Sequence, residues 1–438
     1  MLQVKKRRNI VEQRRESVVR VRLALGYFVL VAVLGLLLRW LLVAPVSWLN
    51  YKNILHAHSH VALLGWLYCA FFATLLYAYK PQSEQARKSF RLQFWLTQVA
   101  VQGMLLSFPV QGYALFSITF STLQILLTYW FAWRFWRHVK DDQLLWHRHY
   151  ISLRFVLLSL VFLVLSSFGP WALGPVMATG GAGGELYYSA IYFYLHFQYN
   201  GWFTFAALGL LFWFLENRNI TYNKSYASRV FWLLTLACVP AFALSVLWTK
   251  PAAAIYWTGG VAAVLQIVAL GYLLRLLWAV RLKLARQLQP WVKFLSLLAL
   301  VSLVVKLAMQ LVSAFPYFAD LAYRLRYFVI GYLHLSLIGF VSLFVLGFFL
   351  QQRLLRLSAM GRAGMVLLLV CFFLTEALLF GQGTLLWQGL PAVPAFNLVM
   401  FIASIGMPVG VLLLFLDQPG LYLYKRPIAA AEADKACA

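Results

Sequence analysis

The sequence predicts an all-α membrane protein with twelve transmembrane helices in three pseudo-repeated four-helix arcs. The 438-residue chain is 63% hydrophobic and only 11% charged, whereas average globular proteins carry about 25% charged residues. Its apolar runs have roughly the 20 residues that a hydrocarbon core of about 30 Å requires. One histidine-containing pattern also occurs three times at nearly constant spacing, which indicates an internal repeat.

The predicted spans follow one another with short connections. Two connections are tight hairpins, one at Pro109 and Gly112 and one at Pro251, because Pro and Gly favour turns. We expect a basic arm at 1–22, a transmembrane domain at 23–418 and a tail at 419–438. The spans lie near 20–46, 54–79, 90–110, 113–136, 151–173, 187–215, 229–248, 252–280, 292–316, 325–350, 363–381 and 395–416.

The basic residues are distributed unequally between alternate connections. Under the twelve-span prediction, 31 of the 37 Lys and Arg residues lie on one side, five lie on the other, and Lys306 lies within a span. This asymmetry predicts that both termini are cytoplasmic and that the protein lies in a bacterial-type cytoplasmic (inner) membrane. The basic arm before a long first helix is typical of a signal anchor. The net charge of +25 therefore faces the lipid bilayer, and nucleic acid is not implied as a partner.

A histidine is followed five residues later by glycine and an aromatic residue in the second, sixth and tenth spans. These histidines share one predicted depth in the outer half of the membrane, roughly 10–16 Å from the outer helix ends. Glycine at that position would let a neighbouring helix or a flat macrocycle approach closely. The three copies are His60-Gly65-Trp66, His196-Gly201-Trp202 and His334-Gly339-Phe340.

A histidine in lipid is costly unless its nitrogens have partners, so three in one register indicate a ligand. We expect His60 and His334 to be the two axial ligands of one low-spin haem b, which would exchange electrons without an open site. His56 lies one turn outward on the face of His60, where it would bond a haem propionate or a water, or serve as an interfacial polar residue. His58 points away and would bond a loop or a neighbouring helix.

Two arginines and a third histidine are further candidates. Arg324 and Arg326 precede the His334 helix and would bind the haem propionates, or else anchor the helix at the interface. His196 would hold copper, a non-haem iron or a second haem, or would be a hydrogen-bonded structural residue. Copper or a second haem is not expected, because a metal normally needs at least three protein ligands and His196 has no obvious companions.

Lys306 and Glu376 lie at similar predicted depths, roughly 20 Å from the cytoplasmic surface. We expect them to pair, either as a neutralising bridge between helices or as part of a proton path. The four cysteines contain no CxxC pair, which disfavours zinc sites and covalent haem attachment.

The string His58-x-His60-x4-Gly65-Trp66 resembles the HxHxxxxGW/F pattern of the haem–copper oxidase and nitric oxide reductase large-subunit (cytochrome oxidase subunit I-like) superfamily. The nitrosative-stress membrane haem protein family carries a very similar string. The resemblance covers about 54–350 in architecture. It implies that His60 and His334 bind a low-spin haem, and that His196 occupies the place of the first copper or non-haem iron ligand.

The chain also departs from the resembling family. Tyr332 stands where the family has the histidine of its high-spin haem, although tyrosine can also ligate a haem. No histidine lies in 228–250, where the family has adjacent metal-binding histidines, and Asn200 matches an acidic position of the reductases. The resemblance therefore implies a degenerate member without a dinuclear centre.

Three functional hypotheses follow. The first is a haem b protein for electron transfer or for a response to NO or O2, with an electron donor or another respiratory membrane subunit as partner. The second is an NO or O2 reductase with an atypical second metal site. The third is a haem-free transporter or structural membrane subunit.

Overall fold

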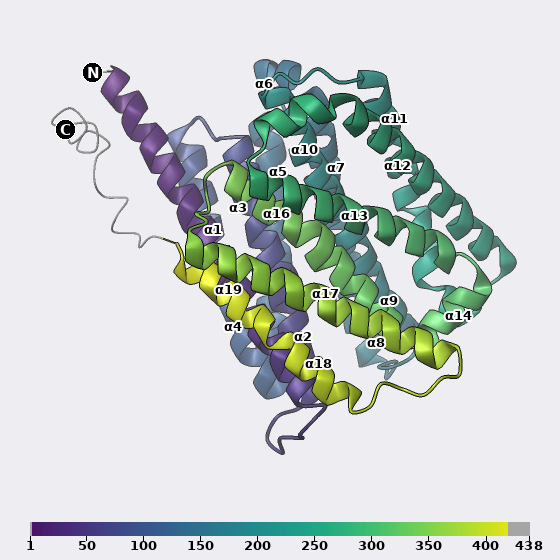
Figure 1. The fold of residues 1–438 in the computed structure, drawn as a ribbon. Helices are drawn as coiled ribbons and strands as arrows, with labels where there is room; N and C mark the ends of the chain where they lie inside the picture. Colours follow the sequence, from purple (N-terminus) through teal and green to yellow (C-terminus); the bar gives the residue numbers. More distant parts are fainter. Residues whose placement is uncertain (1, 419–438) are drawn as a thin grey trace.

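The computed structural model describes residues 2–418, and every regular element in that range is helical. Figure 1 shows long helices packed side by side in one bundle. Nine helical stretches within the described residues are long and apolar enough to cross a membrane. The prediction of an all-α, multi-pass membrane protein is therefore confirmed.

The N-terminal part of the bundle contains one helix that changes type without ending. α2, η1 and α3 form a continuous stretch, Tyr51–Ala78, whose first turn is capped by the Asn50 side chain. α4 ends at Gly112, whose φ of +61° lies in the left-handed region that glycine adopts at little cost. The elements are α1 (Leu2–Trp40), α2 (Tyr51–His60), η1 (Val61–Leu67), α3 (Tyr68–Ala78), α4 (Glu84–Gln111) and α5 (Leu115–Val139).

The middle part contains a helix that breaks at a proline. α11 ends at Cys238 and continues as the 3₁₀ turns η3 and η4, because Pro240 lacks the N–H that an α-helix needs there. The elements are α6 (Gln143–Arg148), α7 (Tyr150–Ser166), α8 (Phe168–Ala178), α9 (Glu185–His196), η2 (Phe197–Phe203), α10 (Thr204–Asn217), α11 (Lys224–Cys238), η3 (Pro240–Ser245), η4 (Leu247–Thr249) and α12 (Ala253–Gln287).

The C-terminal part repeats the change of helix type seen near the N-terminus. α15, η5 and α16 form the continuous stretch Arg326–Gln351. α17 packs along α18 and α19, which in turn pack against α1, so the last helices close the bundle onto the first. The elements are α13 (Pro290–Ser313), α14 (Pro316–Arg324), α15 (Arg326–His334), η5 (Leu335–Ser342), α16 (Leu343–Gln351), α17 (Ala359–Trp387), α18 (Phe396–Ser404) and α19 (Gly406–Leu416).

The predicted N-terminal arm is not separated from the first span in the structure. The basic arm at 1–22 is continuous with the first span, because α1 runs without a break from Leu2 to Trp40. The tail at 419–438 lies outside the described residues.

Three of the twelve predicted spans are not among the nine candidate membrane helices. The predicted spans near 90–110 and 187–215 correspond to α4 and to α9–η2–α10, which are long enough but carry many polar side chains. The predicted span near 229–248 corresponds to α11, which ends after 15 residues at the break before Pro240. Multi-pass architecture is thus shown, whereas a count of twelve stays a prediction.

Tryptophans from two of the repeats lie in the centre of the core. Trp66 and Trp202 are almost fully buried. Trp66 Nε1 donates to Ser342 Oγ at 2.9 Å, and the Trp202 ring lies 5.5 Å from that of Phe71. The segments that follow the three histidines therefore meet near the middle of the bundle.

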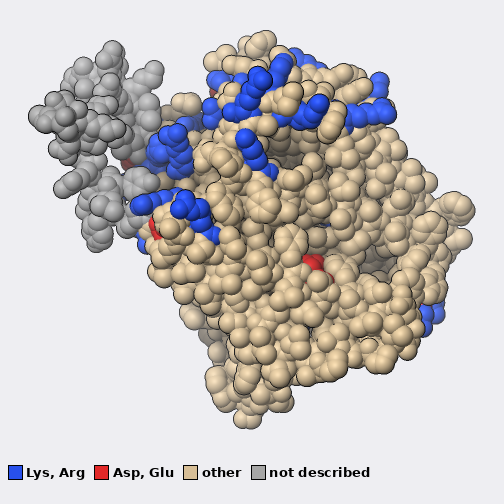
Figure 2. Space-filling model, in the orientation of Figure 1, with Lys and Arg blue, Asp and Glu red and all other residues tan. Residues whose placement is uncertain are grey.

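The two ends of the molecule differ in their content of basic side chains. On the face drawn in Figure 2, Lys and Arg gather at the end that carries α6 and the N-terminal half of α1. The middle band of that face is almost free of charged side chains, as a lipid-facing surface requires.

Candidate functional site

Each of the three repeated histidines is the last α-helical residue before a π-helix. His60 precedes η1, His196 precedes η2 and His334 precedes η5. π-Helical turns are rare and frequently occur at functional sites. The repeated sequence pattern therefore corresponds to a repeated local structure, which spacing alone did not reveal.

The glycines of the pattern allow neighbouring helices to approach. A Cβ added to Gly201 would lie 2.6 Å from Phe162 Cβ, and one added to Gly339 would lie 2.7 Å from Ser302 Oγ. At Gly65 the added atom would lie 3.1 Å from side-chain atoms of its neighbours. The sequence predicted that these glycines would admit a neighbouring helix or a flat macrocycle. In the structure, neighbouring helices pack against them.

His60 faces α4. Its Nδ1–H donates to the carbonyl of His56 at 2.8 Å, and its ring centroid lies 4.3 Å from that of Phe108 and 6.0 Å from that of Tyr113. His56 lies on the same face, with its ring 4.6 Å from Tyr113. The shared face of His56 and His60 is as predicted, but Phe108 of the third predicted span and Tyr113 at the start of the fourth cover it.

His58 faces α1. Its Nδ1 lies 3.1 Å from the carbonyl oxygen of Val31, so the N–H donates to a neighbouring helix as predicted. A Cβ on Gly35 would lie 3.1 Å from His58 Cε1. The absent side chain of Gly35 thus makes room for this imidazole.

His334 has no hydrogen bond, ion pair or ring contact with any part of the chain between residues 2 and 418. Its ring is half-buried, and the titratable groups that act on it electrostatically are Arg39 and His58. The electrostatic interaction with His58 makes that histidine an alternative partner for His334, and the expected partnership of His60 and His334 stays a prediction.

His58 and His60 have different neighbours because of local helix geometry. A step of two residues turns about 200° around a helix, so His58 and His60 point to opposite sides. α1 packs against α2 on the His58 side and α4 packs on the His60 side. A matching register in the sequence does not determine which neighbour each face meets.

The two arginines predicted to bind propionates are both exposed. Arg324 is exposed and forms an ion pair with Asp320 one turn earlier in α14. Arg326 is also exposed, and it acts electrostatically on Tyr192 of α9. Arg39 of α1 is the arginine that acts on both His58 and His334. Its presence within the first apolar run was the sequence signal that could have identified it.

The predicted pair of Lys306 and Glu376 is wrong. Lys306 Nζ donates to Asn200 Oδ1 at 2.5 Å and to Gln310 Oε1 at 3.1 Å. The buried carboxylate of Glu376 has no hydrogen-bond partner within the described residues, and Arg39 is the basic group that acts on it. The two side chains therefore have different neighbours: Asn200 and Gln310 for Lys306, and Arg39 for Glu376.

His196 belongs to a directed chain of hydrogen bonds. Its Nε2–H donates to the carbonyl of Cys238 at 2.8 Å, and its Nδ1 accepts from Asn200 Nδ2 at 3.1 Å. Asn200 in turn accepts from Lys306, which also lies 5.7 Å from the centroid of the Tyr199 ring. Both imidazole nitrogens are engaged, so this geometry favours the hydrogen-bonded structural role over metal ligation. Tyr332 lies beside this network, with its ring 5.9 Å from that of Tyr199.

Between residues 2 and 418, no group of three or more His, Cys, Asp or Glu side chains is placed so that it could hold a metal ion. A scan of the sequence against protein-family models found no match, and a search of curated proteins found no matching relative.

Proposed function

We propose that this membrane protein binds one low-spin haem b between His58 of α2 and His334 of α15. The observation that carries the proposal is the His334 imidazole, which has no partner of its own within the described chain and lies under the electrostatic influence of His58. A polar ring without a partner inside an apolar bundle is costly, and coordination of iron would remove that cost.

The tautomer of His58 fits this role. Metal-bound histidines almost always donate their second ring N–H to a carbonyl or carboxylate. His58 donates Nδ1–H to Val31, which leaves Nε2 free to bind iron. Arg39 provides a guanidinium beside the pair for a propionate carboxylate. Bound between two imidazoles, haem supplies one-electron transfer without an open coordination site.

The wider architecture belongs to the same proposal. The π-helix after each of three equivalent histidines favours three similar four-helix arcs, with α4, α9–α10 and α11 crossing as well as the nine apolar helices. Both termini would then be cytoplasmic, in a bacterial inner membrane, with an electron-donor or respiratory subunit as partner. The scaffold would be that of a cytochrome oxidase subunit I-like protein that carries electrons or responds to NO or O2.

Lys306 supports one alternative from another class. A fully buried lysine without a carboxylate partner in the described chain is a functional-site candidate in any membrane protein. In a haem-free transporter, the chain from Lys306 to Cys238 would serve proton or substrate passage.

An absorption spectrum of the protein purified with haem supplied separates these functions. We expect a Soret peak and a sharp reduced α-band, both lost in His58→Ala and His334→Ala. His60→Ala should keep them, as should the matched control His147→Ala, because His147 is exposed on α6. Absence of haem from the unaltered protein would refute the proposal and favour the transporter. Loss of the α-band in His60→Ala but not in His58→Ala would return the ligand role to His60.

A further inference from the structure

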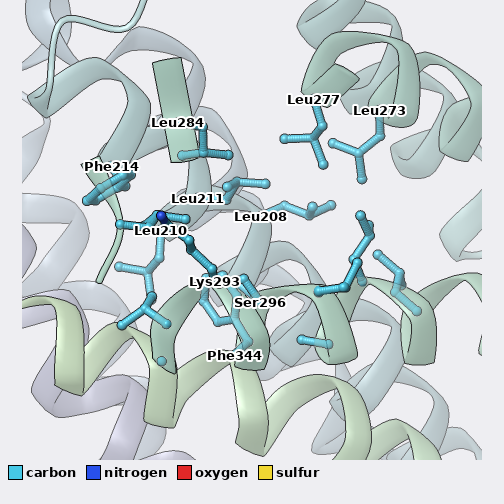
Figure 3. A pocket seen from close by; sticks show the side chains of 18 of the residues that line it. Leu208, Leu210, Leu211, Phe214, Leu273, Leu277, Leu284, Lys293, Ser296 and Phe344 are labelled. Carbon is cyan, nitrogen blue, oxygen red and sulfur yellow. The ribbon is translucent and has the colours of Figure 1, made fainter. Parts of the chain in front are cut away.

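A cavity of about 1050 Å³ lies between α10, α12, α13 and α16. Its volume is slightly above the range of roughly 300–1,000 Å³ that is usual for ligand pockets. None of the histidines discussed above lines it. Figure 3 shows leucines of α10 and α12 surrounding the space, with Lys293 and Ser296 of α13 at its side.

The cavity is mostly apolar, and two of its three basic lining residues, Arg281 and Lys293, lie at one end, whereas Arg275 lies further along α12. Towards the middle of α13 it is lined by Ala299 and Leu303, whereas Lys293 lies in the first turn of that helix. From 293 to 303 the helix rises roughly 15 Å. Arg281 lines the same end, close to the connection between α12 and α13.

Further groups at the basic end suit an anion. The first turn of α13 has no side-chain cap, and helix N-termini favour negatively charged ligands. Gln352, which also lines the cavity, has a buried Nε2 without a hydrogen-bond partner. Neither Lys293 nor Arg281 forms an ion pair with another described residue.

We propose that this cavity binds one anionic phospholipid of the surrounding bilayer. The acyl chains lie along the leucines of α10 and α12, and the phosphate lies at Lys293 and Arg281. Basic pockets between membrane helices on the cytoplasmic side bind anionic headgroups by the same charge complementarity. A neutral ligand would fill the apolar part and leave the basic end unused, so an anionic amphiphile matches the whole cavity.

Native mass spectrometry of the purified full chain tests this site with two lipids of identical acyl chains, phosphatidylglycerol and phosphatidylcholine. In the double variant Arg281→Gln/Lys293→Gln we expect about tenfold or weaker phosphatidylglycerol binding and little change for phosphatidylcholine. Ser296→Trp, which fills the cavity, should weaken both lipids. The control Lys224→Gln/Arg362→Gln removes the same charges from exposed positions outside the lining and should keep phosphatidylglycerol affinity within about twofold.

Three results would overturn the proposal. The first is unchanged phosphatidylglycerol binding in Arg281→Gln/Lys293→Gln. The second is an equal loss in the control variant, which would show attraction to the whole basic surface. The third is that the protein binds a neutral isoprenoid quinone tightly and shows no specific binding of phosphatidylglycerol. In that case the unaltered and Arg281→Gln/Lys293→Gln proteins would bind the quinone equally well. Thermal denaturation in detergent verifies that each variant is folded. If Ser296→Trp does not fold, the comparison of phosphatidylglycerol binding between the unaltered and Arg281→Gln/Lys293→Gln proteins still tests the proposal.

Discussion

Arg39 occupies an unusual place for a basic residue. It is half-buried in α1 and interacts electrostatically with His58, His334 and Glu376. No hydrogen bond or ion pair joins its guanidinium to another described side chain. A guanidinium that interacts electrostatically with two imidazoles and has no ion pair of its own is suited to a carboxylate ligand such as a haem propionate.

Replacing Arg39 by Gln should therefore lower haem affinity by about tenfold, the usual order for a residue that supports a metal site. The low-spin spectrum of the haem that remains should be unchanged, because both imidazoles are still present. Haem titration followed at the Soret band measures this effect. Arg324→Gln is the matched control and should not alter affinity; an effect there equal to that of Arg39→Gln would contradict the assignment.

Asn200 joins two buried groups, His196 and Lys306, each of which has one other hydrogen-bond partner. It accepts from Lys306 and donates to His196, so Asn200→Leu leaves both one bond short. Each lost bond to a buried polar group costs about 1–3 kcal/mol, and we expect the free energy of unfolding to fall by at least about 2 kcal/mol. Thermal denaturation in detergent measures the change.

Two comparisons sharpen the Asn200 experiment. Asn200→Asp retains an acceptor for Lys306 and should recover much of the loss. Gln266→Leu removes a buried amide whose Oε1 has no partner and should be close to neutral. Equal melting temperatures for Asn200→Leu and Gln266→Leu would show that the chain of hydrogen bonds contributes little.

At this scale the sequence predicted the important residue types better than their partners. Burying a polar side chain among apolar residues costs free energy, and the sequence shows such apolar surroundings. This identified His334, His196 and Lys306 as residues that need a partner. The partner of each depends on helix rotation and on which helices are adjacent. Those properties come from packing, so the electrostatic interaction of His334 with His58 and Arg39 could not be predicted from the sequence.

At the scale of single helices, the π-helical segments depend on the glycine within each. Gly201 of η2 packs so closely on α7 that an added Cβ would lie 2.6 Å from Phe162 Cβ. Gly201→Ala is expected to destabilise the protein by about 1–3 kcal/mol through overpacking. Gly381→Ala in α17 is the control, because nothing lies within 4 Å of its added Cβ, and it should be neutral or slightly stabilising. If both variants melt at the same temperature, close packing at Gly201 is not what the pattern provides.

Helix positions were predictable because apolar runs report burial in lipid or protein directly. The helix type was not, since a π-helix differs from an α-helix by one extra residue in a turn and leaves the composition unchanged. The break of α11 at Pro240 had a visible signal in the proline itself. The span near 229–248 was nevertheless predicted as one helix, because the residues around that proline are apolar.

For the whole molecule, the number of helices that cross the bilayer determines where the termini lie, because an even number places both termini on one side. The nine apolar helices and the twelve predicted spans differ in α4, α9–α10 and α11. The strong charge asymmetry of 31 against five basic residues depends on all twelve crossing. With only nine crossings, the same connections would alternate differently and the bias would largely disappear.

Cysteine labelling in intact cells decides between these topologies. We expect Gln82→Cys and Gln143→Cys, introduced into a cysteine-free background, to react with a membrane-impermeant thiol reagent only after the membrane is opened, because they lie in basic connections. Leu115→Cys and Ala182→Cys should react from outside. Gln82 and Leu115 lie on either side of α4, so reaction of both from one side would mean that α4 does not cross. That outcome would remove the equivalence of the second, sixth and tenth spans on which the three arcs depend.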